Sequence, residues 1–147
     1  MGQHVRQQIR EAAVALLTGL PSTGDRVFTG DPYAKSPEDG PFLIVAAPAD
    51  ERDDEWSDIG QIGGRRLALV VIGDAEARDI EDVLDAIACE VEAAIEGQTF
   101  GGLAKNTVFL RVAKDFEDGT SKRAGEVRIE FAVTYRVRTG VPDVAVG

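Results

Sequence analysis

The sequence predicts an α+β domain, in which a mixed, mostly antiparallel β-sheet of about four to five strands carries two main helices on one face. Two observations carry this prediction. Residues 126–138 alternate between apolar and polar side chains, which is the period of a half-buried strand. Residues 3–18 and 80–96 instead place apolar side chains at steps of three and four, which is the period of a helix with one buried face.

The stretch 126–138 is the element around which we expect the sheet to form. Its apolar side holds Val127, Ile129, Phe131, Val133, Tyr135 and Val137, and its other side holds Arg128, Glu130, Ala132, Thr134 and Arg136. Burying each large apolar side chain contributes roughly 1.5–3 kcal/mol. We therefore expect the two helices to cover the apolar side, and the polar side to be available for contact with another subunit.

Three further stretches have the character of strands. Phe42–Ala47 is a continuous apolar run, and Arg65–Gly73 is apolar beyond Arg66. Such runs are typical of strands buried on both faces. Thr107–Lys114 is predicted to place Val108, Leu110 and Val112 on one face and to pair antiparallel with 126–138 across a turn at Asp118-Gly119. A short strand is expected at Arg26–Thr29, followed by a loop over Gly30–Gly40.

Helix boundaries can be read from the neighbouring residues. The first helix is expected to bury a stripe that includes Leu16 and Leu17, and Gly19 and Pro21 end it. The second helix is predicted to begin with Asp79 as its N-cap, while the acids of its first turn favour the positive helix end.

Length, charge and composition limit the possible functions. A chain of 147 residues is expected to form a single domain, with a loose tail at about 139–147. The net charge of −10 argues against tight binding of nucleic acid, but is compatible with a protein that lets DNA pass. One cysteine excludes an internal disulfide framework and, together with one histidine, argues against a Cys/His zinc site. No membrane-spanning segment is expected.

The segment 48–64 is the most acidic part of the chain and is predicted to be a mobile loop. Its acids do not follow the register of a helix–loop–helix calcium site. Trp56 lies among them, and two interpretations remain open. The ring either folds back on its own sheet or anchors another subunit, since aromatic residues are enriched at interfaces.

The sequence predicts no catalytic, cofactor-binding or metal site. It contains no P-loop or dinucleotide-binding glycine pattern, and its one histidine, near the N-terminus, argues against a catalytic triad. The alternative to an assembly role, a metal-assisted hydrolase that uses the carboxylates of residues 50–58, would need a rigid site. The basic pairs Arg65-Arg66 and Lys122-Arg123 are typical of the solvated ends of strands. The alternative is a charge-complementary assembly interface, in which they meet the acidic segment 50–58 of a neighbouring copy. Its candidate residues are Trp56, Asp53, Asp54, Glu55, Arg65, Arg66, Lys122, Arg123, Arg128 and Arg136.

The order of elements resembles that of a known family. The phrases that carry the resemblance are H-V-R-Q-Q-I-R-E-A, R-V-F-T-G-D-P-Y, P-F-L-I-V, R-R-L-A-L-V-V, D-I-E-D-V-L-D-A-I-A-C-E-V-E-A-A-I and V-R-I-E-F-A-V-T-Y-R-V. Over about residues 4–138 the chain is similar to the tail terminator proteins of long-tailed phages, of the lambda minor tail protein U type.

The resemblance implies a structural role in a virion. Such proteins form a homohexameric ring that caps the tail tube, ends its polymerisation and provides the surface that joins the head. The implied partners are further copies of the chain, the tail tube protein and the head–tail connector protein. The implied location is the head-proximal end of the tail, after assembly in the host cytoplasm. A head–tail joining protein of similar fold and a small dimeric α+β ligand-binding module remain the alternatives.

Overall fold

The computed structural model describes residues 2–30, 40–58 and 60–146. Most of the predicted loop 30–40 therefore lies outside the described residues. In chain order the elements are α1 (Val5–Leu17), β1 (Val27–Phe28), β2 (Phe42–Arg52), the 3₁₀ turn η3 (Asp54–Trp56), β3 (Ile62–Ala77), α2 (Ile80–Ile95), β4 (Asn106–Phe116), β5 (Arg123–Arg138) and β6 (Val141–Ala145). The α+β class and the two helices agree with the prediction, but the sheet has six strands rather than four or five.

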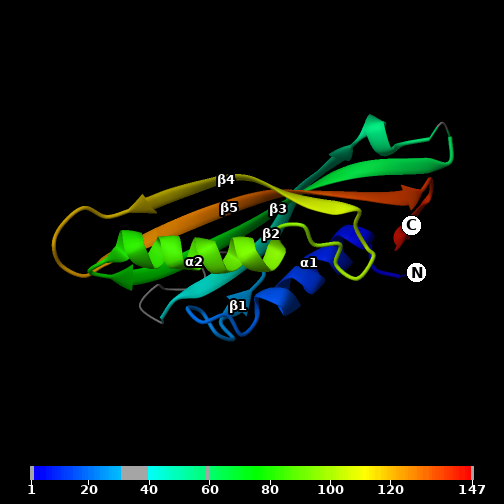
Figure 1. Ribbon diagram of the computed structural model, residues 1–147. Helices are drawn as coiled ribbons and strands as arrows, with labels where there is room; N and C mark the ends of the chain where they lie inside the picture. The colour runs from blue at the N-terminus through cyan, green and yellow to red at the C-terminus, as the bar shows by residue number, and fades with distance from the viewer. Residues whose placement is uncertain (1, 31–39, 59, 147) are drawn as a thin grey trace.

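The sheet is mixed, and all its pairings but one are antiparallel. The main path is β1-β2-β3-β5-β4, and β6 pairs with the end of β5. The short pairing of β1 with β2 is the parallel one. β3 and β5 are 16 residues each and pair along their whole length. At a rise of about 3.3 Å per residue they form a ribbon about 50 Å long, and both helices lie on one side of it (Figure 1).

β5 has the central role that its alternation predicts. Its six apolar side chains are 0–2% exposed and belong to one cluster with the buried residues of α1, α2, β2 and β3. Arg128 on the opposite side is exposed, and Glu130, Thr134 and Arg136 are half-buried. We call this opposite side the helix-free face. On β3 the even-numbered residues share this face, because β3 pairs with β5 without a register shift.

The N-cap of α1 is His4, whose Nδ1 accepts a hydrogen bond from the backbone N–H of Arg6 at 3.1 Å. Its buried stripe is Val5, Ile9, Ala13 and Leu17, four residues apart. The expectation that Leu16 belongs to this stripe is wrong, since its side chain is 38% exposed. A step of one residue turns about 100° around a helix, so Leu16 cannot share the face of Leu17.

α2 packs closely on the sheet because two glycines lie beneath it. A Cβ on Gly125 would lie 2.6 Å from Ile80, and a Cβ on Gly73 would lie 2.8 Å from Ile87. Asp79 is the N-cap residue, as predicted, but its side chain makes no capping hydrogen bond. Its backbone carbonyl accepts from the N–H of Val83 at 3.0 Å. Glu81 and Asp82 lie in the first turn, as the sequence indicates.

β4 does not present Val108, Leu110 and Val112 on one face. A bulge between Phe109 and Arg111 shifts the register against β5 and interrupts the alternation. Phe109 and Val112 consequently pack on the helix-side core, with the Phe109 ring edge-on to Phe131 at 6.3 Å. Val108 and Leu110 are 47% and 57% exposed. The even spacing in the sequence gives no sign of this extra residue.

Four apolar residues of β2 and β3 form a second cluster on the helix-free face. Phe42, Ile44, Val70 and Ile72 are each no more than 5% exposed, and Phe28 of β1 packs against them. This cluster confirms that both faces of β2 and β3 are apolar at this end.

The C-terminal residues, expected to be a loose tail, hold β6, whose Val141 and Ala145 are the register partners of Arg138 and Val137.

Candidate functional site

The acidic segment 48–64 folds as two strand ends joined by a turn. β2 continues as far as Arg52, η3 spans Asp54–Trp56, and β3 begins at Ile62. The side chain of Asp53 caps η3 by accepting from the backbone N–H of Glu55 at 3.1 Å. The hydroxyl of Ser57 donates to the carbonyl of Asp53 and accepts from the N–H of Gly64, both at 2.8 Å. These bonds fix the path of the chain around Trp56.

Trp56 lies over the helix-free face. A Cβ on Gly64 would come within 2.6 Å of the Trp56 Cβ, so only glycine allows this crossing. The guanidinium of Arg136 donates to the Trp56 carbonyl at 3.0 Å and contacts Asp58 at 3.5 Å. The backbone of Trp56 therefore folds back on its own sheet. Its side chain remains 40% exposed, which leaves area for a partner.

Two of the predicted basic residues pair with acids of the same chain. Arg65 lies 3.4 Å from Asp50, and Arg66 lies 3.9 Å from Asp53. Both pairs are diagonal across β2 and β3, because Arg65 lies opposite Arg52, two residues from Asp50, and Arg66 lies opposite Glu51, two residues from Asp53. Asp54 is paired with Arg52 at 2.6 Å, although its side chain is 88% exposed. Since Arg65 and Arg66 are engaged within the chain, they offer less charge to a neighbouring copy than the sequence indicates.

The second basic pair lies at the opposite end of the ribbon, beside the connection between β4 and β5. Lys122 is 64% exposed and lies 3.8 Å from Glu76. Arg123 donates to the backbone carbonyls of Arg78 at 2.6 Å and Glu117 at 3.3 Å, so it stabilises the turn that enters α2. Lys122 is thus the residue of this pair that is available to a partner.

A polar cluster at the start of α1 is the least expected feature of the structure. The Oδ2 oxygen of Asp50 accepts from the Tyr135 hydroxyl, from Arg6 at 3.2 Å and from Arg65 at 3.4 Å. The Asp50 side chain is only 7% exposed. Burial, and next the hydrogen bond to Asp50, raise the pKa of Tyr135 well above its usual range. Burial, followed by the charges of Arg6 and Arg65, lowers the pKa of His4.

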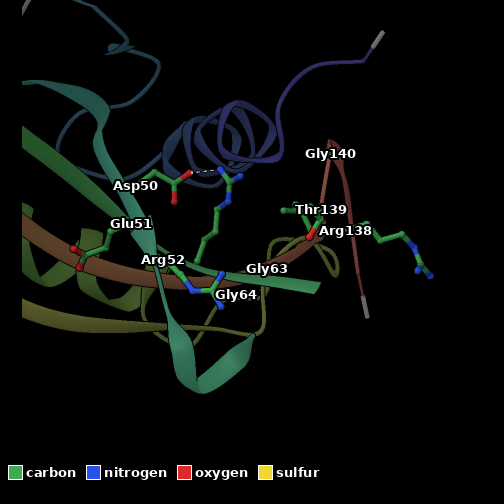
Figure 2. A pocket seen from close by; sticks show the side chains of 10 residues that line it. Asp50, Glu51, Arg52, Gly63, Gly64, Arg138, Thr139 and Gly140 are labelled. Carbon is green, nitrogen blue, oxygen red and sulfur yellow. Dashed lines mark hydrogen bonds and ion pairs between the residues drawn. The ribbon is translucent and has the colours of Figure 1, made fainter. Parts of the chain in front are cut away.

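A cavity of about 340 Å³ adjoins this cluster (Figure 2). Its walls are the ends of three strands and a turn, formed by Asp50–Arg52, Gly63–Arg65 and Val137–Gly140. Figure 2 shows the Arg138 side chain extending away from Asp50. Asp50 is held by two arginines and a phenol, and its burial suits an ion-paired structural acid.

The other unusual acid is Asp74. It lies opposite Glu126 in the β3–β5 pairing, and Glu126 lies opposite Asp115 in the β4–β5 pairing. Burial, and next the charge of Glu126, raise the pKa of Asp74 to about 6. Among the residues that the structure describes, no three His, Cys, Asp or Glu side chains are grouped so that they could hold a metal ion.

The helix-free face also holds residues that the sequence analysis did not single out. A groove of about 250 Å³ on this face is lined by Ala49, Glu51, Arg66, Leu67, Ala68, Leu110, Phe131 and Ala132. Leu110, which lines the groove, and Val108, which lies opposite Ala132, are both exposed. Alanines in a strand give no signal of a contact surface, so only the assembled sheet reveals this groove. Arg128, which was predicted, lies on the same face.

Comparison with known proteins agrees with the fold. A chain in the solved structure of the virion of a native gene transfer agent (GTA) particle matches with a TM-score of 0.51 at 20% sequence identity. The match covers 89% of this chain and 92% of that chain. No protein-family model and no curated protein matches the sequence. Neither helix in the described parts of the chain is long and apolar enough to cross a membrane.

Proposed function

We propose that this protein is a structural component of a phage-like virion, which caps the tail tube as a ring of six copies. The observation that carries the proposal is the fold, which is shared over 89% of the chain with a chain of a gene transfer agent virion. The resemblance of the sequence to phage tail terminators gives the finer role. In that role the ring ends polymerisation of the tube and presents a surface to the head–tail connector.

The distribution of charge supports an assembly role. The acidic η3 turn and Lys122 lie at opposite ends of the ribbon formed by β3 and β5. Different surfaces that meet head to tail can close into a ring when the rotation between copies allows it. We propose that Trp56, Asp54, Glu55, Lys122, Arg128 and Arg136 contribute to such contacts. Asp53, Arg65, Arg66 and Arg123 support them from within the chain.

The net charge suits a ring through which DNA must move. A protein that grips DNA neutralises phosphates with Lys and Arg and releases their counterions. This chain carries 26 acidic against 16 basic residues, so its average field repels phosphate. We propose that DNA passes through the ring without specific binding.

The alternative functions are less well supported. A metal-assisted hydrolase would need the carboxylates of residues 50–58 to be free for a metal. Asp50, Asp53 and Asp54 instead pair with arginines of their own chain. A head–tail joining protein of similar fold would share the virion location but would not stop growth of the tube.

The test is a capping assay with the tail tube protein of the same particle. Tubes are allowed to polymerise with and without this protein, and their lengths and ends are examined by electron microscopy. We expect a cap with sixfold symmetry at one end and an arrest of elongation. Tubes that bind the protein without arrest would favour the joining protein, and tubes that grow unchanged and uncapped would overturn the proposal.

A further inference from the structure

β4 is an edge strand with an open outer side. In the described parts of the chain it pairs with β5 alone, and it forms one margin of the sheet (Figure 1). The N–H of Glu117, just after β4, donates to the carbonyl of Ala124 on β5 at 3.1 Å. Residues of an antiparallel strand point their backbone groups alternately toward and away from their partner, so Val112 and Lys114 present theirs outward. Free donors and acceptors of this kind can pair with a further strand.

The other outer strands of the described sheet are less suited to such pairing. β2 is unpaired on its outer side beyond the two residues that meet β1, but it contains Pro48 and a bulge between Ala46 and Ala49. β6 has five residues and contains Pro142. Proline has no backbone N–H and is one of the features that keep edges from pairing. β4 has 11 residues and no proline, so the β4 of a second copy is the partner that suits it best.

Antiparallel pairing of two β4 strands about Ala113 brings opposite charges together. Backbone groups that point outward must face each other, so Val112 of one copy pairs with Lys114 of the other. The same register places Arg111 of one copy directly opposite Asp115 of the other, on the helix-free face. Both of these side chains are exposed. Because the arrangement has two-fold symmetry, the ion pair forms twice.

The surroundings of Asp115 favour a base from a second copy. Asp115 lies opposite Glu126 of β5, and Glu126 lies opposite Asp74 of β3. Three acids therefore follow one another across three strands, and like charges in directly opposite positions destabilise a sheet. Arg128 is beside this row on β5, so the row keeps an excess of negative charge. A guanidinium at the open edge offsets the remaining repulsion.

Arg111 can supply this guanidinium without losing its partner in its own chain. Its Nε lies 3.1 Å from a carboxylate oxygen of Glu130, and its side chain is 66% exposed. A guanidinium has five N–H donors in a planar fork, so it can bind two carboxylates at once. Arg111 therefore joins Glu130 of its own copy to Asp115 of the other.

The helix side of the edge also accommodates a second strand. A groove of about 470 Å³ there is lined by Asp85, Ala88, Cys89 and Glu92 of α2 and by Val112 of β4. Lys114 of the second copy, paired with Val112, lays its aliphatic stem along this groove. Its ammonium group then approaches the acids of the groove. Arginine and lysine on an edge strand ordinarily discourage pairing, but here both meet acids of the second copy.

We propose that two copies of this protein join edge to edge through antiparallel pairing of β4 with β4, about a two-fold axis at Ala113. The two six-stranded sheets form one continuous sheet, with the helices of both copies on the same side. The bulge between Phe109 and Arg111 breaks the alternation, so the pairing spans residues 111–115. A contact of this length gives a weak dimer, whose population depends on concentration.

This contact does not rest on the proposed function. A two-fold contact joins two copies and cannot by itself close a ring of six. The two proposals have different readouts, because capping of tubes tests the ring, whereas the mass and cross-linking of the free protein test the dimer.

The first experiment measures the mass of the full chain by light scattering over a range of concentrations. We expect the mass to rise from that of a monomer to that of a dimer. Asp115→Arg should weaken the dimer about tenfold, since two ion pairs become two repulsions. The matched control is Asp54→Arg, the same change at the opposite end of the ribbon, where the side chain is 88% exposed. A protein that stays monomeric, or an assembly that both variants affect alike, overturns the proposal.

The second experiment exchanges the two charges. Arg111→Asp alone should also weaken the dimer about tenfold, for the same reason. The double variant, Arg111→Asp with Asp115→Arg, should recover most of the loss, because each acid again faces a base. Circular dichroism checks that all variants are folded. Losses that simply add in the double variant exclude this register.

Disulfide trapping locates the axis. A residue on the two-fold axis faces its own counterpart, so Ala113→Cys should form an intermolecular disulfide under a mild oxidant. The background is Cys89→Ser, which removes the exposed native thiol. The control is Val108→Cys on the same strand, where the side chain is 47% exposed but lies about 33 Å from its counterpart in this register. Trapping at Ala113 alone supports the axis, and trapping at both positions alike, or at neither, contradicts it.

Discussion

The hydroxyl of Tyr135 donates a hydrogen bond to the Oδ2 oxygen of Asp50, which joins the core strand β5 to the end of β2. Tyr135 is fully buried, and the same oxygen of Asp50 also binds Arg6 of α1 and Arg65 of β3. One carboxylate thus connects three strands and a helix. It sits between the apolar core and the acidic segment that we assign to assembly.

Removing the phenol oxygen should cost stability without changing the fold. We expect Tyr135→Phe to lower the free energy of unfolding by about 1–2 kcal/mol, because Asp50 loses one buried hydrogen bond and keeps two arginines. Urea denaturation followed by circular dichroism measures the change. Asp54→Asn is the control, since it removes an exposed ion pair and should change stability by less than about 1 kcal/mol. Equal stability of Tyr135→Phe and the wild type would show that the hydrogen bond contributes nothing.

Substitution of Gly64 by alanine should disturb the structure, whereas the same substitution at the neighbouring Gly63 should not. A Cβ at Gly64 would lie 2.6 Å from Trp56, whereas a Cβ at Gly63 meets nothing closer than a carbonyl oxygen at 3.8 Å. We expect Gly64→Ala to displace the η3 turn and to destabilise the protein by about 1–3 kcal/mol. The emission of Trp56, the one tryptophan of the chain, reports the displacement directly. Gly63→Ala should leave the emission unchanged, and a shift of similar size in both variants would refute this account.

Asp74 should make the protein less stable as the pH rises. Its folded-state pKa of about 6 lies above the ordinary value of 3.8, because of burial and the nearby Glu126. Between these values the folded state holds the proton more tightly than the unfolded state, so stability is lost as the pH rises through this window. After allowance for solvent screening, we expect Asp74 to lower the free energy of unfolding of the wild type by about 1–2 kcal/mol between pH 4 and pH 7. Asp74→Asn should abolish this decrease. Denaturant titrations across this range supply the measurement, and parallel curves for the two proteins would count against it.

The acidic surface should prevent retention on DNA. With a net charge of −10, we expect the protein to pass through a column of immobilised double-stranded DNA at moderate salt. A variant in which several exposed acids of β2 and η3, such as Glu51 and Glu55, are changed to lysine should be retained more strongly. Retention of the wild type that falls as salt is raised would contradict the proposal that DNA passes freely.

The spacing of apolar residues along the sequence by itself determined the α+β fold class of this protein. The alternation of residues 126–138 identified β5 and the buried side of its six apolar residues, because a strand exposes its side chains with a period of two. The helical periodicity of 3–18 and 80–96 identified α1 and α2 to within a few residues. Such local periods depend only on backbone geometry, so they can be read without knowledge of the partners.

Only the tertiary structure decided what depends on the register between strands. The bulge in β4 moved Val112 to the helix-side core, and the pairing of β2 with β3 placed Arg66 beside Asp53 of the same chain. The contact of Tyr135 with Asp50 spans 85 positions of the sequence, and no local pattern indicates it. One extra residue in a strand reverses every later side chain, and the sequence does not mark where it is inserted. The residues that lie on each exposed face therefore depend on how the strands pair in the folded sheet. The periodicity of the sequence predicts the strands but not these faces.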